Sequence, residues 1–380
     1  MQGIGAAIVA PSALSLLTAT FVERRARARA VALYGATAGI GASLGLVIGG
    51  ALADWVSWRA GFFMNVPVGT AMILLAPRFI PESTRSRGRF DLTGALSATA
   101  GVGALVYGVI HSAGSGWHTA ATVIPILSGV VLLAVLVLAE IRAAEPVMPL
   151  RLFASRIRTG AYVARMLYLG AMIGFFFYST QYLQGVLGFS AFDAGVAFFP
   201  MTVVNFAVAM TIPRLTARLG HAVPLTAGVL LTLSGMAWLA QVQVTSSYWT
   251  AVALPMVLIG AGQGLAFAPL TSAGIAGVGT SDAGAASGLV NTFHQLGMAL
   301  GLSVLVAVAA NSGYGLTTAA ALTAHVHTAL TAGTVLLGAC LLAVLGLIRP
   351  AHPRNRRALP AGAHLDGCAA VEPASAMTSA

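Results

Sequence analysis

The chain has 380 residues, of which 58% are hydrophobic and only 8% are charged. A soluble globular domain carries about 25% charged residues, so this composition excludes a protein whose surface faces water alone. The 20 basic residues are all arginine, they outnumber 10 acidic residues, and the formal net charge is +10. The arginines occupy short segments between apolar runs and form no basic stripe with interleaved aromatic residues, which excludes a nucleic-acid-binding groove.

Apolar runs of membrane-spanning length recur along the chain. A spanning helix needs about 20 predominantly apolar residues. By this criterion we expect eleven transmembrane helices, near residues 1–21, 31–53, 60–80, 92–112, 119–139, 160–183, 194–213, 222–242, 250–272, 285–310 and 327–348. The expected fold is therefore an all-α polytopic membrane bundle.

The positions of the arginines predict the orientation of the bundle. All of them except Arg59 and Arg165 lie in alternate loops or in the C-terminal segment, within residues 24–29, 78–89, 142–158, 214–218 and 349–357. Positively charged loops remain in the cytoplasm, so we expect a multi-pass protein of the inner (plasma) membrane with a cytoplasmic C-terminus. An odd number of spans then places Met1 outside. Residues 349–380 are rich in proline, alanine and arginine, and are expected to form a disordered tail.

The second predicted span is dense in glycine, with residues Gly35, Gly39, Gly41, Gly45, Gly49 and Gly50. Glycines four residues apart share one helix face and allow two backbones to approach closely. Ordinary helix packing is one interpretation, although this density is greater than packing usually needs. We expect a bulky side chain at Gly45 or Gly49 to wedge packed helices apart.

The third predicted span begins with the string Trp58-Arg59-Ala60-Gly61-Phe62-Phe63-Met64-Asn65-Val66-Pro67. Tryptophan and arginine are typical anchors at a membrane interface. Asn65 and Pro67 fall in the first turns of the helix, where a polar side chain can hold a backbone that proline disturbs.

These strings, in this order, resemble the fourteen-span drug:proton antiporter family of the major facilitator superfamily. The resemblance is carried by QGIGAA, which contains Gln2, Gly3 and Gly5, by the glycine stripe, and by the Trp58 string. It continues with YLQGVLG from Tyr182, GAGQG from Gly260 and SGLVNTFHQLG from Ser287. The resemblance implies transport-motif roles for Gln2, Gly3, Gly5, Gly41, Gly45, Gly49, Gly50, Asn65 and Pro67. Leu46 stands where the family often has proline, which weakens the usual kink.

Members of that family have six helices, two linker helices and six more. Aligned with them, residues 1–80 are the remainder of an N-terminal half with three spans, and 81–158 hold two linker spans and a cytoplasmic loop. Residues 159–348 are a C-terminal six-helix half, and 349–380 are the tail. The eleven spans correspond to the fourth to fourteenth, so the first three are expected to be missing.

The resemblance implies an exporter of hydrophobic drugs or antibiotic-like metabolites, working by alternating access against a proton gradient and needing no cofactor. Its expected partners are small hydrophobic or amphipathic substrates and the lipid bilayer, and its oligomeric state is not predicted. The alternative is a truncated, non-transporting remnant or an assembly partner of such a transporter. A membrane-embedded enzyme is disfavoured, because no nucleophile and base are paired. Nor does any cluster of histidine and cysteine have metal-ligand spacing.

Five residues are candidates for lining a substrate cavity. Three of them, Tyr178, Gln181 and Tyr182, lie in the span 160–183, and Gln263 and Phe267 lie in the span 250–272. Both spans match cavity-lining helices of the family. An aromatic pocket with sparse polar groups suits bulky amphipathic compounds, although membrane aromatics also pack or face lipid.

Proton coupling has fewer candidates, because no Asp or Glu lies at the centre of a predicted span. His294, with Asn291 and Gln295 beside it, is the best substitute for a buried carboxylate. A lone membrane histidine can instead be a hydrogen-bonding link between helices. Arg165 is close enough to a helix end that we expect its side chain to snorkel to the cytoplasmic face.

Overall fold

Helices make up all the regular secondary structure in the part of the chain that the structure describes. The structure is a computed structural model, and it describes residues 2–21, 23–80, 91–142, 148–279, 282–310, 312–313, 315 and 318–348, apart from some side chains of the first two helices and that of residue 113. Residues 1–349 form one unit and residues 350–380 a second. The predicted disordered tail, 349–380, lies outside the described residues.

The elements follow one another as helices of very different lengths. In chain order they are α1 (Gln2–Thr20), α2 (Arg24–Trp55), α3 (Trp58–Phe63), α4 (Asn65–Phe79), α5 (Leu92–Ser115), α6 (Ala120–Arg142), η1 (Leu150–Ala154), α7 (Arg156–Gly185), α8 (Ala191–Val196), α9 (Phe199–Ala209), α10 (Ile212–Leu219), α11 (Ala222–Leu239), η2 (Trp249–Ala253), α12 (Leu254–Gly274), α13 (Ala283–Ala309), α14 (Thr318–Ala343) and η4 (Val344–Ile348). η1 is a 3₁₀-helix, whereas η2 and η4 are π-helical turns.

Nine helical segments within these residues are long and apolar enough to cross a membrane. They are Trp58–Phe79, Leu92–Ser112, Ala120–Arg142, Arg156–Gly185, Ala191–Ala209, Ala222–Leu239, Trp249–Gly274, Ala283–Ala309 and Thr318–Ile348. Each overlaps one of the predicted spans, so the all-helical membrane fold is confirmed. The first two predicted spans, 1–21 and 31–53, lie on α1 and α2. There the structure describes only part of the side chains, including a shorter apolar stretch, Leu44–Trp55.

The last span begins earlier than the sequence predicts. α14 starts at Thr318 instead of residue 327, so His325 and His327 lie within the helix and not at its edge. The His327 Nδ1 atom lies 2.6 Å from the carbonyl oxygen of Ala240, which joins α14 to the end of α11. The threonine and histidine content of 318–327 lowers its hydropathy and hides this helical extension.

The third span is interrupted at Met64, between α3 and α4. Proline has no N–H to donate, so Pro67 leaves the carbonyl of Phe63 without its usual helical partner. Next to this gap the side-chain amide of Asn65 donates to the carbonyl of Phe62 at 3.3 Å. Ser57 accepts from the N–H of Arg59 and caps the start of α3.

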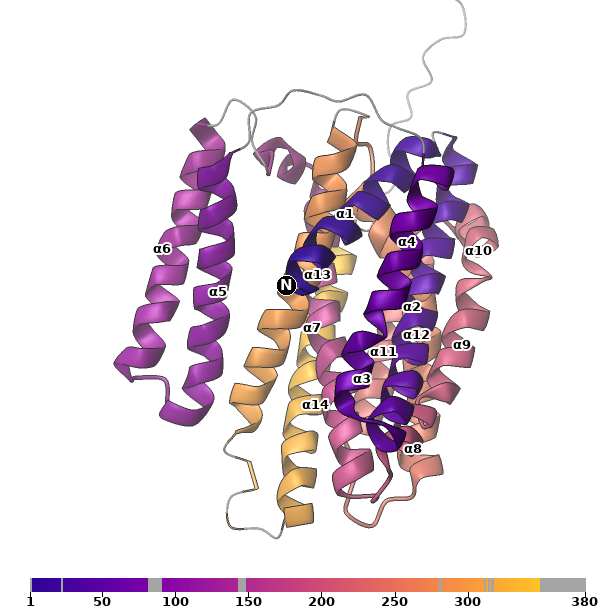
Figure 1. The fold of residues 1–380 in the computed structure, drawn as a ribbon, viewed down its shortest axis with the longest axis vertical. Helices are drawn as coiled ribbons and strands as arrows, with labels where there is room; N and C mark the ends of the chain where they lie inside the picture. The colour runs from indigo at the N-terminus through magenta and orange to yellow at the C-terminus, as the bar shows by residue number, and fades with distance from the viewer. Residues whose placement is uncertain are drawn as a thin grey trace, which may run out of the picture. The chain divides into compact units, whose positions relative to one another are not determined.

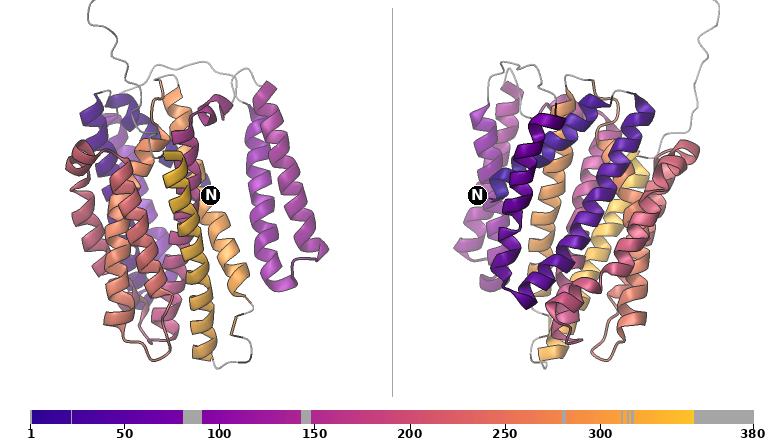
Figure 2. Two further views of the ribbon diagram at one scale, coloured as in Figure 1. Left: turned by 180° about the vertical axis from the view of Figure 1, so that it is seen from behind. Right: turned by 45° about the vertical axis from the view of Figure 1, so that its right-hand side comes forward.

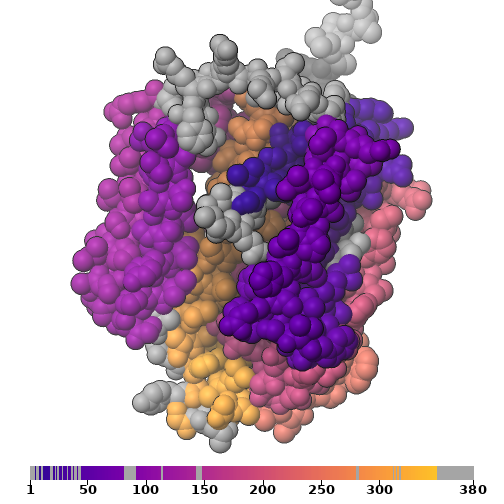
Figure 3. All heavy atoms as spheres, in the orientation of Figure 1, coloured from indigo at the N-terminus to yellow at the C-terminus, as the bar shows by residue number. Residues whose placement is uncertain are grey.

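Several helices pack closely along their lengths, as Figures 1 and 2 show. α7 packs against α13, α14 and α12, and α11 packs against α12 and α14. α5 and α6 form a hairpin whose α5 member contacts α13, and α2 crosses α8 and α9. α3 and α4 bury no residue and lie on the face of the molecule that Figure 3 shows. These contacts make α7 and α12 the central elements among residues 148–348.

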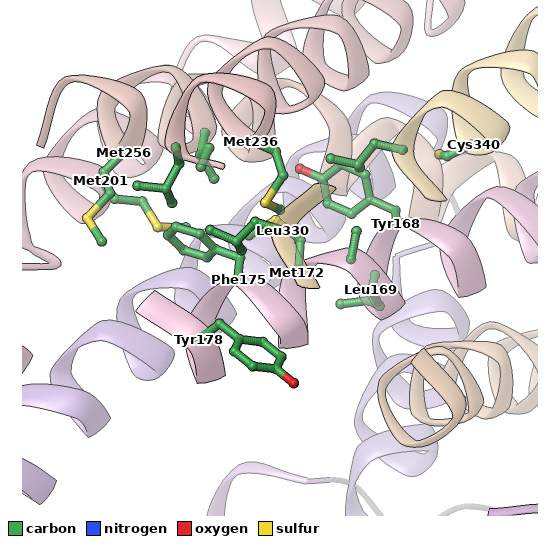
Figure 4. Close-up of a cluster of buried hydrophobic side chains, with 14 of the residues drawn as sticks. Tyr168, Leu169, Met172, Phe175, Tyr178, Met201, Met236, Met256, Leu330 and Cys340 are labelled. Atoms are coloured by element: carbon green, nitrogen blue, oxygen red, sulfur yellow. The ribbon is translucent and has the colours of Figure 1, made fainter. Parts of the chain in front are cut away.

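The largest core cluster is rich in methionine and aromatic side chains (Figure 4). Met172 and Phe175 of α7 meet Met201 of α9, Met236 of α11 and Met256 of α12, and none of the five is more than 2% exposed. Methionine is flexible and fills irregular gaps between helices. The cluster therefore joins four helices without requiring one rigid packing.

Glycine allows the closest crossing between α7 and α13. A Cβ added to Gly170 would lie 3.1 Å from the carbonyl oxygen of Gly297 and 3.3 Å from the Cα of Gly301. A Cβ at Gly301 would collide with the backbone of Gly170. This crossing brings the polar side chains of α7 and α13 within reach of each other.

Candidate functional site

A buried arginine lies where α7, α12 and α13 meet. Arg165 of α7 is only 3% exposed. Its Nη1 donates to the hydroxyl of Thr271 on α12 at 2.7 Å, and its Nη2 lies 3.0 Å from Nδ1 of His294 on α13. The guanidinium carbon lies 4.7 Å from the centre of the Phe267 ring. The expectation that Arg165 snorkels to the cytoplasmic face is therefore wrong, because its polar atoms are held by neighbouring helices.

The contact with Arg165 fixes the hydrogen-bonding state of His294. A guanidinium has donors and no acceptor, so Nδ1 of His294 must accept in this contact. The imidazole is then neutral, with its proton on Nε2. Addition of a proton at Nδ1 would remove the hydrogen bond and place two positive charges side by side. The ring of Phe267 packs edge-on against the imidazole at a centroid distance of 6.2 Å.

Residue spacing on α12 explains how the site is built. Gln263, Phe267 and Thr271 follow one another at intervals of four, so they lie along one helix face. Glycines on the other faces hold α12 close to its neighbours, since a Cβ at Gly264 would meet Asn205 of α9 and one at Gly262 would collide with α11. The close packing of those faces directs Phe267 and Thr271 toward α7.

Three buried polar atoms, one each on α7, α12 and α13, lack a hydrogen-bond partner. They are Nε of Arg165, Oε1 of Gln263 and Oγ of Ser287. Gln263 lies one turn before Phe267 on α12, and Ser287 lies two turns before His294 on α13. Unsatisfied buried polar groups are rare in folded proteins and often mark functional positions. The unsatisfied atoms therefore extend the polar region beyond the direct contacts of Arg165.

Among the residues with described positions, no carboxylate forms an ion pair with Arg165. The ion pair present there joins Arg151 and Asp282, at 2.6 Å. α2 approaches this site at Gly35, because a Cβ at Gly35 would lie 3.0 Å from Cδ1 of Phe267. A positive charge inside a membrane bundle is costly and marks functional positions by default.

A second set of contacts ties η1 to the ends of α12 and α13. Besides the pair of Arg151 and Asp282, Arg158 donates to the carbonyls of Leu152 at 2.9 Å and Ala276 at 3.0 Å. The hydroxyl of Tyr162 donates to the carbonyl of Gly274 at 2.9 Å. The Asp282 carboxylate raises the pKa of Arg151 above its ordinary value. This cluster joins the connection before α7 to the helices that carry Thr271 and His294.

The predicted cavity residues divide between two regions. Phe267 contacts Arg165, and Gln263 lies one turn away from Phe267. Tyr178, Gln181 and Tyr182 lie 13 to 17 residues further along α7 than Arg165, which corresponds to about 20–25 Å in a helix. The structure does not bring these three side chains to Arg165.

The three α7 residues differ in their surroundings. The hydroxyl of Tyr182 donates to the carbonyl of Gln243 at 2.7 Å, which joins α7 to the loop after α11. Tyr178 points away from the methionines of the core (Figure 4). Gln181 is half-buried. Their roles in substrate binding remain predictions.

The coupling candidates are also separated by their helix positions. Asn291 is half-buried and lies one turn before His294, on the same face of α13. Gln295 is exposed and points about 100° away from His294 around the helix. His294 alone of the three contacts Arg165. Thr271 and Arg165 were not predicted as site residues, although an arginine inside an apolar run is a recognisable signal.

The transport-motif residues lie mostly outside this site. The side chain of Gln2 and the surroundings of Gly3 lie outside the described part of the structure. A Cβ at Gly5, Gly41, Gly45 or Gly49 would meet nothing within 4 Å, whereas one at Gly50 would collide with the backbone of Ala191 on α8. Among the described glycines of the stripe, the close helix contacts are at Gly35 and Gly50, and not, as expected, at Gly45 or Gly49. Asn65 and Pro67 shape the break between α3 and α4.

Within the described ranges no group of three or more His, Cys, Asp and Glu could hold a metal ion.

Comparison with known proteins gives one family and a set of export and resistance proteins. Residues 1–302 match the family described as Major Facilitator Superfamily. The chain is 35% identical to the cephamycin export protein of Amycolatopsis lactamdurans, over 95% of this chain and 74% of that protein. It is 33% identical to the multidrug resistance protein Stp of Mycobacterium tuberculosis, over 81% and 57%. It is 34% identical to the puromycin resistance protein of Streptomyces alboniger, over 91% and 71%. The chain thus spans 57% to 74% of the lengths of these relatives.

Proposed function

Because the chain belongs to the Major Facilitator Superfamily, we propose that it is an efflux transporter that exports small hydrophobic or amphipathic, antibiotic-like compounds. The observation that carries this proposal is the polar cluster of Arg165, Thr271 and His294, buried among three apolar membrane helices. A small number of convergent polar groups in an apolar setting is typical of a site for amphipathic ligands. The names of the relatives, which are export and resistance proteins, support the same substrate class.

The proposed mechanism is alternating access coupled to proton entry. In this scheme the substrate site opens to each side of the membrane in turn, through movement of packed helices. The α7–α13 crossing at Gly170 and Gly301 is smooth enough for such movement, because neither residue has a side chain. The fourteen-span architecture of the antiporter family remains part of the proposal.

His294 is the proposed proton-sensitive residue. A proton at Nδ1 competes directly with the hydrogen bond from Arg165 on α7. Among the described residues, the charged group at this contact is Arg165 itself, while α12 contributes the uncharged Phe267 and Thr271. Proton binding would therefore release the guanidinium and loosen the junction of α7 and α13.

The location proposed for this multi-pass protein is the inner (plasma) membrane, with the C-terminus in the cytoplasm. The arginine-rich loops support this orientation through the positive-inside rule. Arg151 of η1 and Arg158 at the start of α7 contact residues next to the ends of α12 and α13. These arginines support a cytoplasmic position for this cluster.

Export can be tested with an uncharged dye in living cells. The chain is expressed in a bacterial strain that lacks its own multidrug exporters, and accumulation of Nile red is followed with and without a protonophore. Lower accumulation that the protonophore reverses is the expected result. His294→Gln is the site variant, and His118→Gln, in the exposed turn before α6, is the matched control. Unchanged accumulation with a membrane-inserted chain would contradict export and favour the non-transporting remnant or assembly partner.

A further inference from the structure

We propose that Arg165 binds a carboxylate of the transported compound, so that the site prefers amphipathic compounds with a carboxylate over their uncharged analogues. The inference rests on the proposed export function and adds the charge and anchoring group of the substrate. It begins from a buried guanidinium with one nitrogen, Nε, that has no hydrogen-bond partner.

The donors of Arg165 are only partly used. Nη1 bonds to Thr271 and Nη2 contacts His294. Nε has no partner, and each Nη carries two N–H bonds of which one is accounted for. A carboxylate can bind to Nε and Nη2 side by side, which is the bidentate geometry that arginine forms best. The existing contacts hold the guanidinium plane in place, so that this edge is pre-oriented.

The described acidic residues are engaged elsewhere or lie in other parts of the fold. Asp282 pairs with Arg151, and Asp54 accepts from the backbone N–H of Phe192. The others are Glu23 before α2, Asp91 at the start of α5, Glu140 near the end of α6, and Asp193 in α8. A buried charge is normally paired. The residues described here give Arg165 neutral partners only, which leaves the negative partner to a ligand.

The neighbours of Arg165 favour a carboxylate attached to an apolar body. Phe267 covers one side of the guanidinium at 4.7 Å, and its ring can also contact an apolar group. Gln263, one turn away on α12, has a buried oxygen without a donor. That oxygen can accept an N–H or O–H group of the same ligand. Separation of α7 from α12 and α13 during alternating access would open the route to these atoms.

The test measures the preference for a carboxylate directly. The full chain is purified into phosphatidylcholine nanodiscs, and binding of N-dansyl-phenylalanine is compared with binding of its methyl ester. The two probes share the same dansyl-phenylalanine body and differ at the carboxyl group, which is ionised in the acid and a neutral methyl ester in the other. Wild type is expected to bind the acid at least about tenfold more tightly, as a modest charge-assisted contact would give.

Two arginine variants separate a specific site from general charge effects. Arg165→Gln should remove the preference for the acid while leaving ester binding within about twofold, a small change on the affinity scale. Arg218→Gln, on the exposed face of α10, should keep the full preference. If Arg165→Gln does not fold, the ratio of acid binding to ester binding is compared between wild type and Arg165→Lys instead.

The outcomes distinguish the inference from the export proposal. Equal binding of acid and ester by wild type, or an unchanged preference in Arg165→Gln, would overturn the carboxylate site and leave export standing. If wild type prefers the acid but does not export Nile red, the carboxylate site stands and the export proposal is overturned. Binding of neither probe counts against the site. Loss of the preference when phosphatidylglycerol is added to the nanodiscs would identify a lipid headgroup as the occupant and overturn the substrate assignment.

Discussion

The guanidinium of Arg165 on α7 lies 3.0 Å from Nδ1 of His294 on α13, in a contact that requires the imidazole to be neutral. The two residues are 129 positions apart in the chain. Arg165 carries a permanent positive charge, whereas an imidazole can be neutral or protonated. A proton on Nδ1 of His294 would therefore remove the hydrogen bond that joins these two membrane helices.

His294→Gln should remove the pH dependence of export while keeping the protein folded. The glutamine oxygen can accept from Arg165 but does not titrate. Wild-type transport should vary with pH, because a proton on His294 competes with Arg165, and the variant should vary little. Initial rates of dye efflux at a series of pH values check this. A variant with the wild-type pH profile would show that another group carries the dependence.

Thr271→Val should destabilise the protein by about 1–3 kcal/mol, because it removes an acceptor from a buried charged donor. Thr271→Ser keeps the hydroxyl and should cost less. Thr226→Val is the matched control, since the Thr226 hydroxyl bonds only to the carbonyl of Ala222 in its own helix. Thermal unfolding of the three purified variants provides the comparison. Equal stability of Thr271→Val and Thr226→Val would contradict a structural contribution from the Arg165 contact.

The helices were predictable from the sequence because lipid imposes a simple length and polarity requirement on each span. Local chemistry was also readable in part, since Asn65 beside Pro67 already indicated a disturbed helix start. The extension of α14 to Thr318 was missed because polar residues that pack against other helices lower the hydropathy of a span.

The site was harder to predict for a different reason. The position of Arg165 along α7 was known, but its rotation toward Thr271 and His294 depends on helices more than 100 residues away. Glycines such as Gly170 and Gly301 decide which helix faces meet. A single sequence does not show which glycines on different helices come together. The roles of Tyr178 and Gln181 remain predictions for the same reason.

The pair of Arg151 and Asp282 should stabilise the cluster around η1 in a salt-dependent manner. Side-chain exposures of 67% and 22% mean that solvent screens the interaction, so the effect should be small. Asp282→Arg should lower the unfolding temperature at low ionic strength, and the exchanged pair Arg151→Asp with Asp282→Arg should recover part of the loss. Unfolding curves at low and high salt test this. The absence of recovery at low salt would show that the ion pair itself contributes nothing.

Gly49 and Gly50 provide a matched test of helix packing on α2. A Cβ at Gly49 meets nothing within 4 Å, whereas one at Gly50 collides with the backbone of Ala191 on α8. Gly49→Ala should be neutral or stabilising by up to about 1 kcal/mol, because alanine has the higher helix propensity. Gly50→Ala should destabilise by about 1–3 kcal/mol, since backbone atoms must shift to admit the methyl group. Thermal stability and export of the two variants give the answer, and a Gly50→Ala protein as stable as Gly49→Ala would refute the close approach of α2 to α8.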